Sequence, residues 1–162
     1  MTKHKHFSVL LFLVFAISTA SIAQNNTDNL NHNPFESPPD TIPKIFGKGI
    51  ITIEDRAEFG LAISPSYDES YILFNSRRPD SFGEHDIYIV FKTNKGSWTA
   101  PINLGGQINT DVSETCPSIS PDGKFIFFSR YNDLNGKPDI YWVSSSVIGK
   151  LRNQLLITTV KN

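Results

Sequence analysis

The sequence predicts an all-β fold built from two tandem copies of one unit, each with four short antiparallel strands. Three observations support this prediction. The second half of the chain repeats the residue pattern of the first, and each copy contains short apolar segments separated by turn residues. Neither copy has the sustained 3.6-residue apolar period that indicates helices, so helical repeats are a poor alternative.

The repetition appears when the chain from Pro43 is set above the chain from Pro101. The matched positions are Pro43 with Pro101, Gly47 with Gly105, Ile50 with Ile108, Thr52 with Thr110, Ser64-Pro65 with Ser120-Pro121, Arg77 with Arg130, and Asp86-Ile87-Tyr88 with Asp139-Ile140-Tyr141. The offset between the copies shortens along the chain, which places the differences in length in the loops.

The strands are predicted from the apolar segments. They are expected over residues 115–120, 125–129 and 139–143 of the second copy, with the region 98–104 supplying a fourth strand to the first copy. The middle strands are apolar without alternation, which indicates burial on both faces. Residues 121–124 form a turn, in which Asp122 is a typical turn residue and Gly123 supplies a positive φ.

The segments SPDGKFIFFSR and DIYWV, with the segment WTAPINLGGQINT between the copies, resemble the WD40-like β-propeller repeats of the TolB type found in exported bacterial proteins. The resemblance covers about residues 43–151. It implies two four-stranded antiparallel propeller-type blades, and thus an incomplete β-propeller, because closed propellers have about 4 to 8 blades. The first copy departs from the pattern at residues 64–70, where the turn is longer and has no Gly.

The first residues are typical of a secretory signal peptide, with Lys3 and Lys5 before an apolar core and cleavage expected after Ala23. A membrane anchor is the alternative, but the apolar core is far shorter than the about 20 residues that span a bilayer. We therefore expect no membrane span, and export to the periplasm or the medium. The expected organisation is a signal peptide over 1–23, a disordered Asn- and Pro-rich tether over 24–42, blade repeats over 43–100 and 101–153, and a C-terminal tail over 154–162, with a last strand or a frayed end over 155–160.

Charge and cysteine content argue against nucleic-acid binding and exclude an internal disulfide. The net charge is −1, and the chain becomes more acidic when Lys3 and Lys5 leave with the signal peptide, so no nucleic-acid partner is expected. Cys116 is the only cysteine, so an internal disulfide is impossible. Its apolar surroundings predict a small buried residue.

Two arginine–aspartate pairs recur in the repeats. Arg77 with Asp86, and Arg130 with Asp139, lie at the end of the second strand and the start of the third. These positions face each other at the base of an antiparallel hairpin loop, so cross-strand ion pairs are expected. A charged ligand site is the alternative, but repetition in both copies favours a scaffold role.

No catalytic or metal-binding pattern is present. After signal cleavage the histidines are His32 and His85, and neither a G-x-S-x-G nor an H-E-x-x-H pattern occurs. The loop 133–139 has oxygen side chains around a Gly, but it lacks the distal Glu of a calcium loop. We expect no metal, no cofactor and no enzymatic activity.

The sequence therefore predicts a non-enzymatic exported binding or scaffold module whose partner is a protein or a carbohydrate. The alternatives are a fragment of a propeller enzyme acting on carbohydrate or peptide, or a truncated relative without function. The long polar loops between the second and third strands supply the candidate ligand residues, because loops on a rigid scaffold commonly carry recognition. These are Arg78, Asp80, Glu84, His85, Tyr131, Asn132, Asp133 and Lys137.

Two blades packed together leave both outer faces uncovered. Exposed apolar faces larger than a few hundred Å² usually mark an interaction site. Repeat arrays generally need about three or more units to be stable alone. We therefore expect self-association or pairing with other propeller blades.

Overall fold

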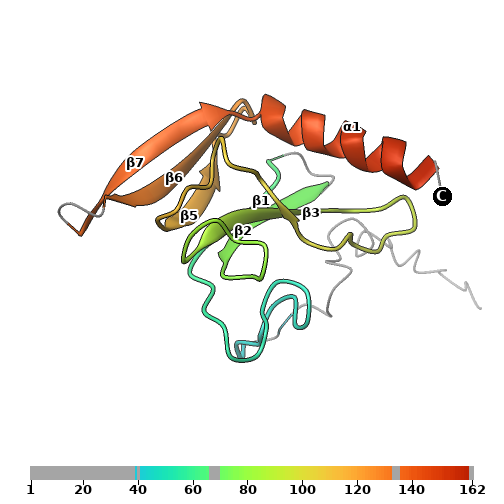
Figure 1. Cartoon of the computed structure of the whole chain (residues 1–162). Coiled ribbons are helices and arrows are strands. Elements are labelled where there is room, and N and C mark those ends of the chain that lie inside the picture. The colour runs from blue at the N-terminus through green and yellow to red at the C-terminus, as the bar shows by residue number, and fades with distance from the viewer. Residues whose placement is uncertain (1–38, 40, 66–69, 133–135, 161–162) are drawn as a thin grey trace, which may run out of the picture. The chain divides into compact units, whose positions relative to one another are not determined.

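The computed structural model describes residues 39, 41–65, 70–132 and 136–160. The predicted signal peptide, nearly all of the predicted tether and the candidate residue Asp133 lie outside the described residues. The described chain is mostly β, with two antiparallel sheets of four and three strands and one helix (Figure 1). Each sheet is an open meander with two edges.

The first sheet contains β1 (Leu61–Ile63), β2 (Tyr71–Ser76), β3 (Asp86–Phe91) and β4 (Ile102–Asn103), in that spatial order. β2 and β3 are rich in aromatic and β-branched residues, which favour strands. Every residue of both strands is buried, so the prediction of burial on both faces is confirmed here. In their pairing, Leu73 lies opposite Ile89 and Phe74 lies opposite Tyr88.

The second sheet contains β5 (Glu114–Ile119), β6 (Phe125–Asn132) and β7 (Lys137–Ser144). Gly123 in the β5–β6 turn has φ +71°, the conformation that the predicted turn requires. Cys116 lies at an irregularity in the β5–β6 pairing with φ +51°, and it is exposed, so the prediction of a buried thiol is wrong. β7 is exposed along almost its whole length, so burial on both faces does not extend to this strand.

The main core lies between the sheets. One face of the first sheet (Tyr71, Leu73, Ile87 and Ile89) shares a cluster with Ile126 and Phe128 of the second sheet and with Leu104 and Ile108 of the connector, residues 104–110. The opposite face of the first sheet (Ile72, Phe74, Tyr88 and Val90) is covered by Ile51, with Phe46, Ile50 and Trp98 packed against that cluster. We call residues 46–52 the leading segment. Both faces of the first sheet are thus covered, although the sequence predicted that its outer face would be open.

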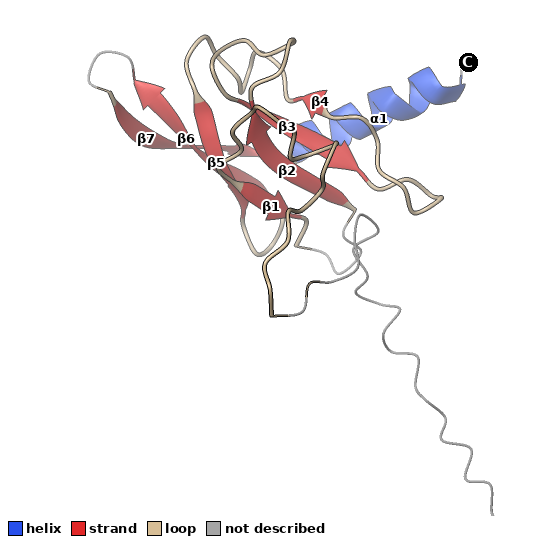
Figure 2. Ribbon diagram, turned by 90° about the horizontal axis from the view of Figure 1, so that it is seen from below, coloured by secondary structure: helices blue, strands red, loops and turns tan. Residues whose placement is uncertain are grey.

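The chain continues after β7 into α1 (Ser146–Val160), the blue helix of Figure 2. The Ser144 hydroxyl accepts the backbone N–H of Ser146 at 3.2 Å, which stabilises the start of the helix. Val147, Leu151 and Leu155 recur every four residues and pack against the main core. This packing outweighs the β-branched residues near the helix end, so the predicted last strand or frayed end over 155–160 is wrong.

The helix also crosses the predicted boundary between the second blade repeat, which ends at 153, and the tail, which starts at 154. The described residues of the second sheet include no fourth strand. Within the described part of the chain, no helix has the length and apolarity needed to cross a membrane.

Candidate functional site

Arg78 and Arg130 hold equivalent positions in the two repeats. Arg78 donates through Nη2 to the carbonyl of Ile50 at 2.6 Å, and Arg130 donates through Nη2 to the carbonyl of Ile108 at 2.5 Å. The Arg78 guanidinium lies 5.3 and 5.4 Å from the ring centroids of Phe74 and Tyr88, and that of Arg130 lies 5.5 and 4.5 Å from those of Phe128 and Tyr141. Each arginine therefore connects the segment before its sheet to two paired strands, which are β2 and β3 for Arg78 and β6 and β7 for Arg130.

The true counterpart of Arg130 is thus Arg78, and the sequence matched the wrong one of two adjacent arginines. Arg77 instead forms an exposed ion pair with Glu84 at 3.0 Å. Arg130 pairs with Glu114 at 2.7 Å, although Asp139 lies opposite it in the strand register. The expected Arg77–Asp86 and Arg130–Asp139 ion pairs are therefore corrected to Arg77–Glu84 and Arg130–Glu114.

Asp86 is fully buried and organises the loop before β3. Its carboxylate accepts the backbone N–H groups of Phe82 at 2.7 Å and Gly83 at 3.1 Å, and the Nδ2 of Asn103 at 2.7 Å. These donors satisfy a carboxylate that burial would otherwise destabilise. The hydrogen bonds of the Asp86 carboxylate therefore fix the conformation of this loop.

The connector completes the first sheet through a side chain. Asn109 is buried, and its Oδ1 accepts the N–H of Ile87 at 2.8 Å while its Nδ2 donates to the Ile87 carbonyl at 2.9 Å. The amide thereby imitates the backbone of a neighbouring strand. The loop before β3 also lies close to the end of the connector and the residues after it, because a Cβ added at Gly83 would lie 2.8 Å from the carbonyl oxygen of Thr110 and 1.8 Å from that of Val112.

Three of the predicted ligand residues on the first loop already have partners within the chain. Arg78 is half-buried and donates to the carbonyl of Ile50, and its burial lowers the pKa of its guanidinium from the ordinary value. Asp80 accepts the phenolic hydrogen of Tyr88 at 3.0 Å, and burial raises the pKa of that phenol. Glu84 is engaged with Arg77. For all three residues, ligand binding stays a prediction.

His85 and Tyr131 come from different repeats and meet at one pocket of about 370 Å³. Phe59, Ser113, Thr115 and Cys116 complete its lining. The His85 ring meets Phe59 edge-on, with the ring centroids 5.1 Å apart. The sequence thus named two residues that the fold brings together. Asn132 ends β6 opposite Lys137, which is exposed at the start of β7.

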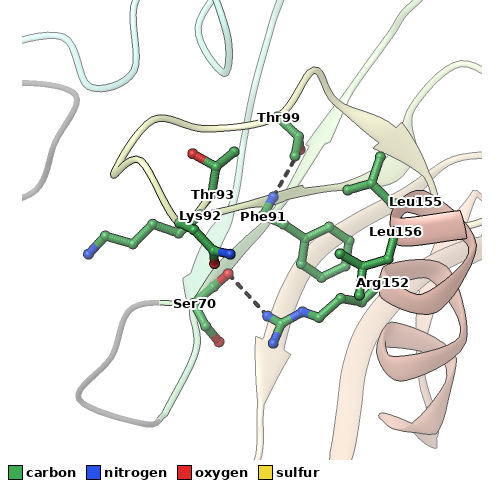
Figure 3. A pocket seen from close by; sticks show the side chains of 9 residues that line it. Ser70, Phe91, Lys92, Thr93, Thr99, Arg152, Leu155 and Leu156 are labelled. Carbon is green, nitrogen blue, oxygen red and sulfur yellow. Dashed lines mark hydrogen bonds between the residues drawn. The ribbon is translucent and has the colours of Figure 1, made fainter. Parts of the chain in front are cut away.

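A larger pocket of about 610 Å³, not foreseen from the sequence, lies between α1 and the end of β3 (Figure 3). Phe91, Leu155 and Leu156 give it an apolar lining. Lys92 and Arg152 also line it, and Arg152 donates to the Ser70 carbonyl at 3.2 Å and lies 4.9 Å over the Phe91 ring. None of the described residues that line this pocket has a buried polar side-chain atom without a hydrogen-bond partner.

An exposed apolar surface lies on the outer face of the second sheet, which we define as Phe125, Phe127, Ile140 and Trp142. Alternate residues of a strand point to opposite faces, so these side chains point away from the core residues Ile126 and Phe128. The Trp142 ring centroid lies 5.0 Å from that of Phe125 and 6.3 Å from that of Phe127. Ile140 and Trp142 remain 71% and 64% exposed. This aromatic cluster has no covering element in the described chain.

Within the described ranges no group of three or more His, Cys, Asp or Glu side chains is placed to hold a metal ion. Comparison with protein families, with curated proteins and with solved structures finds no match for this chain.

Proposed function

We propose that this chain is an exported, non-enzymatic binding module that holds a protein partner against the outer face of the second sheet. One observation carries the proposal: a continuous group of large apolar side chains, two of them mostly exposed, lies on a face that the described chain leaves uncovered. Apolar patches of this kind mark sites of protein association, and Trp is enriched among the residues that dominate binding energy.

The shape of this surface favours a protein over a small molecule. The outer face is the surface of two paired strands, and the pockets described above lie elsewhere, beside His85 and beside α1. Small ligands generally need a concave site with a few placed polar groups. An apolar surface formed by two paired strands is better suited to contact with the apolar side chains of another protein.

The architecture proposed from the sequence, two consecutive blades of an incomplete propeller, gains support from the matching of the sheets. The pair Phe74–Tyr88 in the first sheet has its counterpart in Phe128–Tyr141 of the second. Each pair carries an arginine that reaches back to the preceding segment. Export rests on the signal-like residues 1–23.

Site-specific photo-crosslinking of the full chain in an exporting bacterial host tests the proposal. A photoreactive amino acid at Ile140 should give protein adducts, and the same amino acid at Asn153, exposed on α1, should give far fewer. The substitution Trp142→Ser should reduce the adducts formed from position 140. Equal labelling from both positions, or labelling of glycans alone, would refute the protein-binding function.

A further inference from the structure

In the first repeat, the surface equivalent to the outer face is covered by part of the chain itself. We infer that the outer face of the second sheet binds the leading segment of a second copy of this chain, in a head-to-tail arrangement. This inference rests on the proposed function, since it names the partner of the same face. It follows from comparing what covers each sheet.

Every residue of the outer face has an equivalent in the first sheet. Strand pairing sets the equivalence, because Phe127 lies opposite Trp142 as Leu73 lies opposite Ile89. The matched residues are Tyr71 with Phe125, Leu73 with Phe127, Ile87 with Ile140, and Ile89 with Trp142. The four residues of the first sheet are all buried in the main core. The same surface is therefore covered in one repeat and open in the other.

The residues that cover this surface in the first repeat identify the missing partner. Besides the second sheet, Leu104 and Ile108 of the connector pack there, and both are buried. Their equivalents one repeat earlier are Phe46 and Ile50, since Arg78 holds the carbonyl of Ile50 as Arg130 holds that of Ile108. Phe46 and Ile50 are only partly buried. The leading segment thus has the residue types that the outer face needs.

The leading segment cannot reach the outer face of its own chain. It lies on the far side of the first sheet, where Ile51 is packed against Ile72 and Phe74. Beside it, Ile42 and Ile45 are 73% and 60% exposed. Each chain therefore carries two separate apolar surfaces that match each other and cannot meet within one molecule.

Such an interface joins two different surfaces and is heterologous. Repetition of a heterologous contact gives a closed ring if the rotation closes and a filament if it does not. The signature of this arrangement is that blocking either surface leaves one competent surface on each chain. Two differently blocked chains can then form a dimer and nothing larger.

The experiment uses this signature on the purified protein. Ile140→Asp blocks the outer face, Ile45→Asp blocks the surface beside the leading segment, and Leu156→Asp, exposed on α1, is the matched control. Light scattering over a concentration series measures the mass, and circular dichroism checks the fold. Trp142→Asp and Phe46→Ser serve as second variants if either first variant fails to fold.

The native chain and Leu156→Asp should associate as concentration rises, whereas each blocked variant should associate at least about tenfold more weakly. An equal mixture of the two blocked variants should form dimers. Association of Ile45→Asp at the native strength would overturn the inference, since it indicates pairing between two outer faces. A native chain that stays monomeric would also overturn it. Protein adducts from position 140 that contain another protein would then leave the proposed function standing without this partner.

Discussion

Arg130 donates through Nε to the Oε1 of Glu114 at 2.7 Å, and the Glu114 carboxylate is fully buried. The same carboxylate accepts the backbone N–H and the hydroxyl of Thr110, at 3.0 and 2.5 Å. One ion pair therefore joins the connector, β5 and β6. Removal of the arginine leaves a buried charge without its counterion.

The substitution Arg130→Gln should lower the free energy of unfolding by about 3 kcal/mol, because breaking a buried pair from one side leaves an uncompensated charge. Arg77→Gln is the matched control, since the Arg77–Glu84 pair is exposed and should contribute less than about 1 kcal/mol. Urea unfolding of both variants measures the difference. Equal losses in the two variants would contradict this account of the buried pair.

Asn109→Ala should destabilise the protein by about 2 kcal/mol, because it leaves the buried N–H and carbonyl of Ile87 without the bonds that the amide supplies. Gln107→Ala, on the exposed part of the same connector, should change stability by less than about 0.5 kcal/mol. Hydrogen exchange provides a local readout, since the Ile87 amide should exchange faster in Asn109→Ala. Unchanged protection at Ile87 would show that the side chain does not stabilise this edge.

Gly83→Ala should destabilise the fold, since its new Cβ would lie 1.8 Å from a backbone oxygen that cannot simply rotate away. The loop or the connector must shift, at a cost of about 1 to 3 kcal/mol. Gly149→Ala is the control in α1, where a Cβ meets nothing within 4 Å. It should raise stability by up to about 1 kcal/mol through helix propensity. Thermal unfolding should therefore shift in opposite directions for the two variants.

Acid stability should depend on Asp122. The hydrogen bond from Ser120, together with those from Lys124, lowers the pKa of Asp122 from 3.8 to about 2. A lowered native pKa means that the stabilisation is present above the unfolded-state value and is lost as the pH falls through the native value. Asp122→Asn should therefore lose less stability than the native chain between about pH 4 and pH 2. Thermal midpoints across that range test this, and parallel pH profiles would exclude a contribution from Asp122.

The strands were predictable because their apolar segments carry the signal. β2, β3, β6 and β7 lie where continuous aromatic and β-branched residues predicted them. The exposure of β7 was not predictable from β7 itself, since its composition matches that of β3. What differs is the packing on the face of Ile140 and Trp142: the equivalent face of β3 packs against the connector and the second sheet, whereas no described element covers that of β7.

The sequence misjudged two features for physical reasons. Arg77 and Arg78 are adjacent, so pattern matching alone could not decide which one repeats Arg130, and only the contact with Ile50 decides it. The helix α1 was missed because its last residues are β-branched. The recurrence of Val147, Leu151 and Leu155 was the available signal for this helix.

The role of the candidate residues was only partly foreseeable. His85 and Tyr131 were candidate ligand residues from two loops far apart in the chain, and both line one pocket. The outer face of the second sheet was expected to be open, and Trp142 and Ile140 are exposed there. The packing of the leading segment on the first sheet was not foreseen, because the sequence of residues 46–52 does not indicate which face of a sheet they would cover.

The hydrogen bonds of the Asn109 amide also determine where the chain can be cut to build fusions between repeats. The first sheet is finished only by residues of the following repeat, through β4, the N–H of Leu104 bonded to the Ile87 carbonyl, and Asn109. A gene fusion that cut between residues 100 and 101 would separate this sheet from the residues that close its edge. The module that could be exchanged as a unit therefore runs from β1 to the end of the connector. Its boundaries differ from those of the sequence repeat, which ends at residue 100.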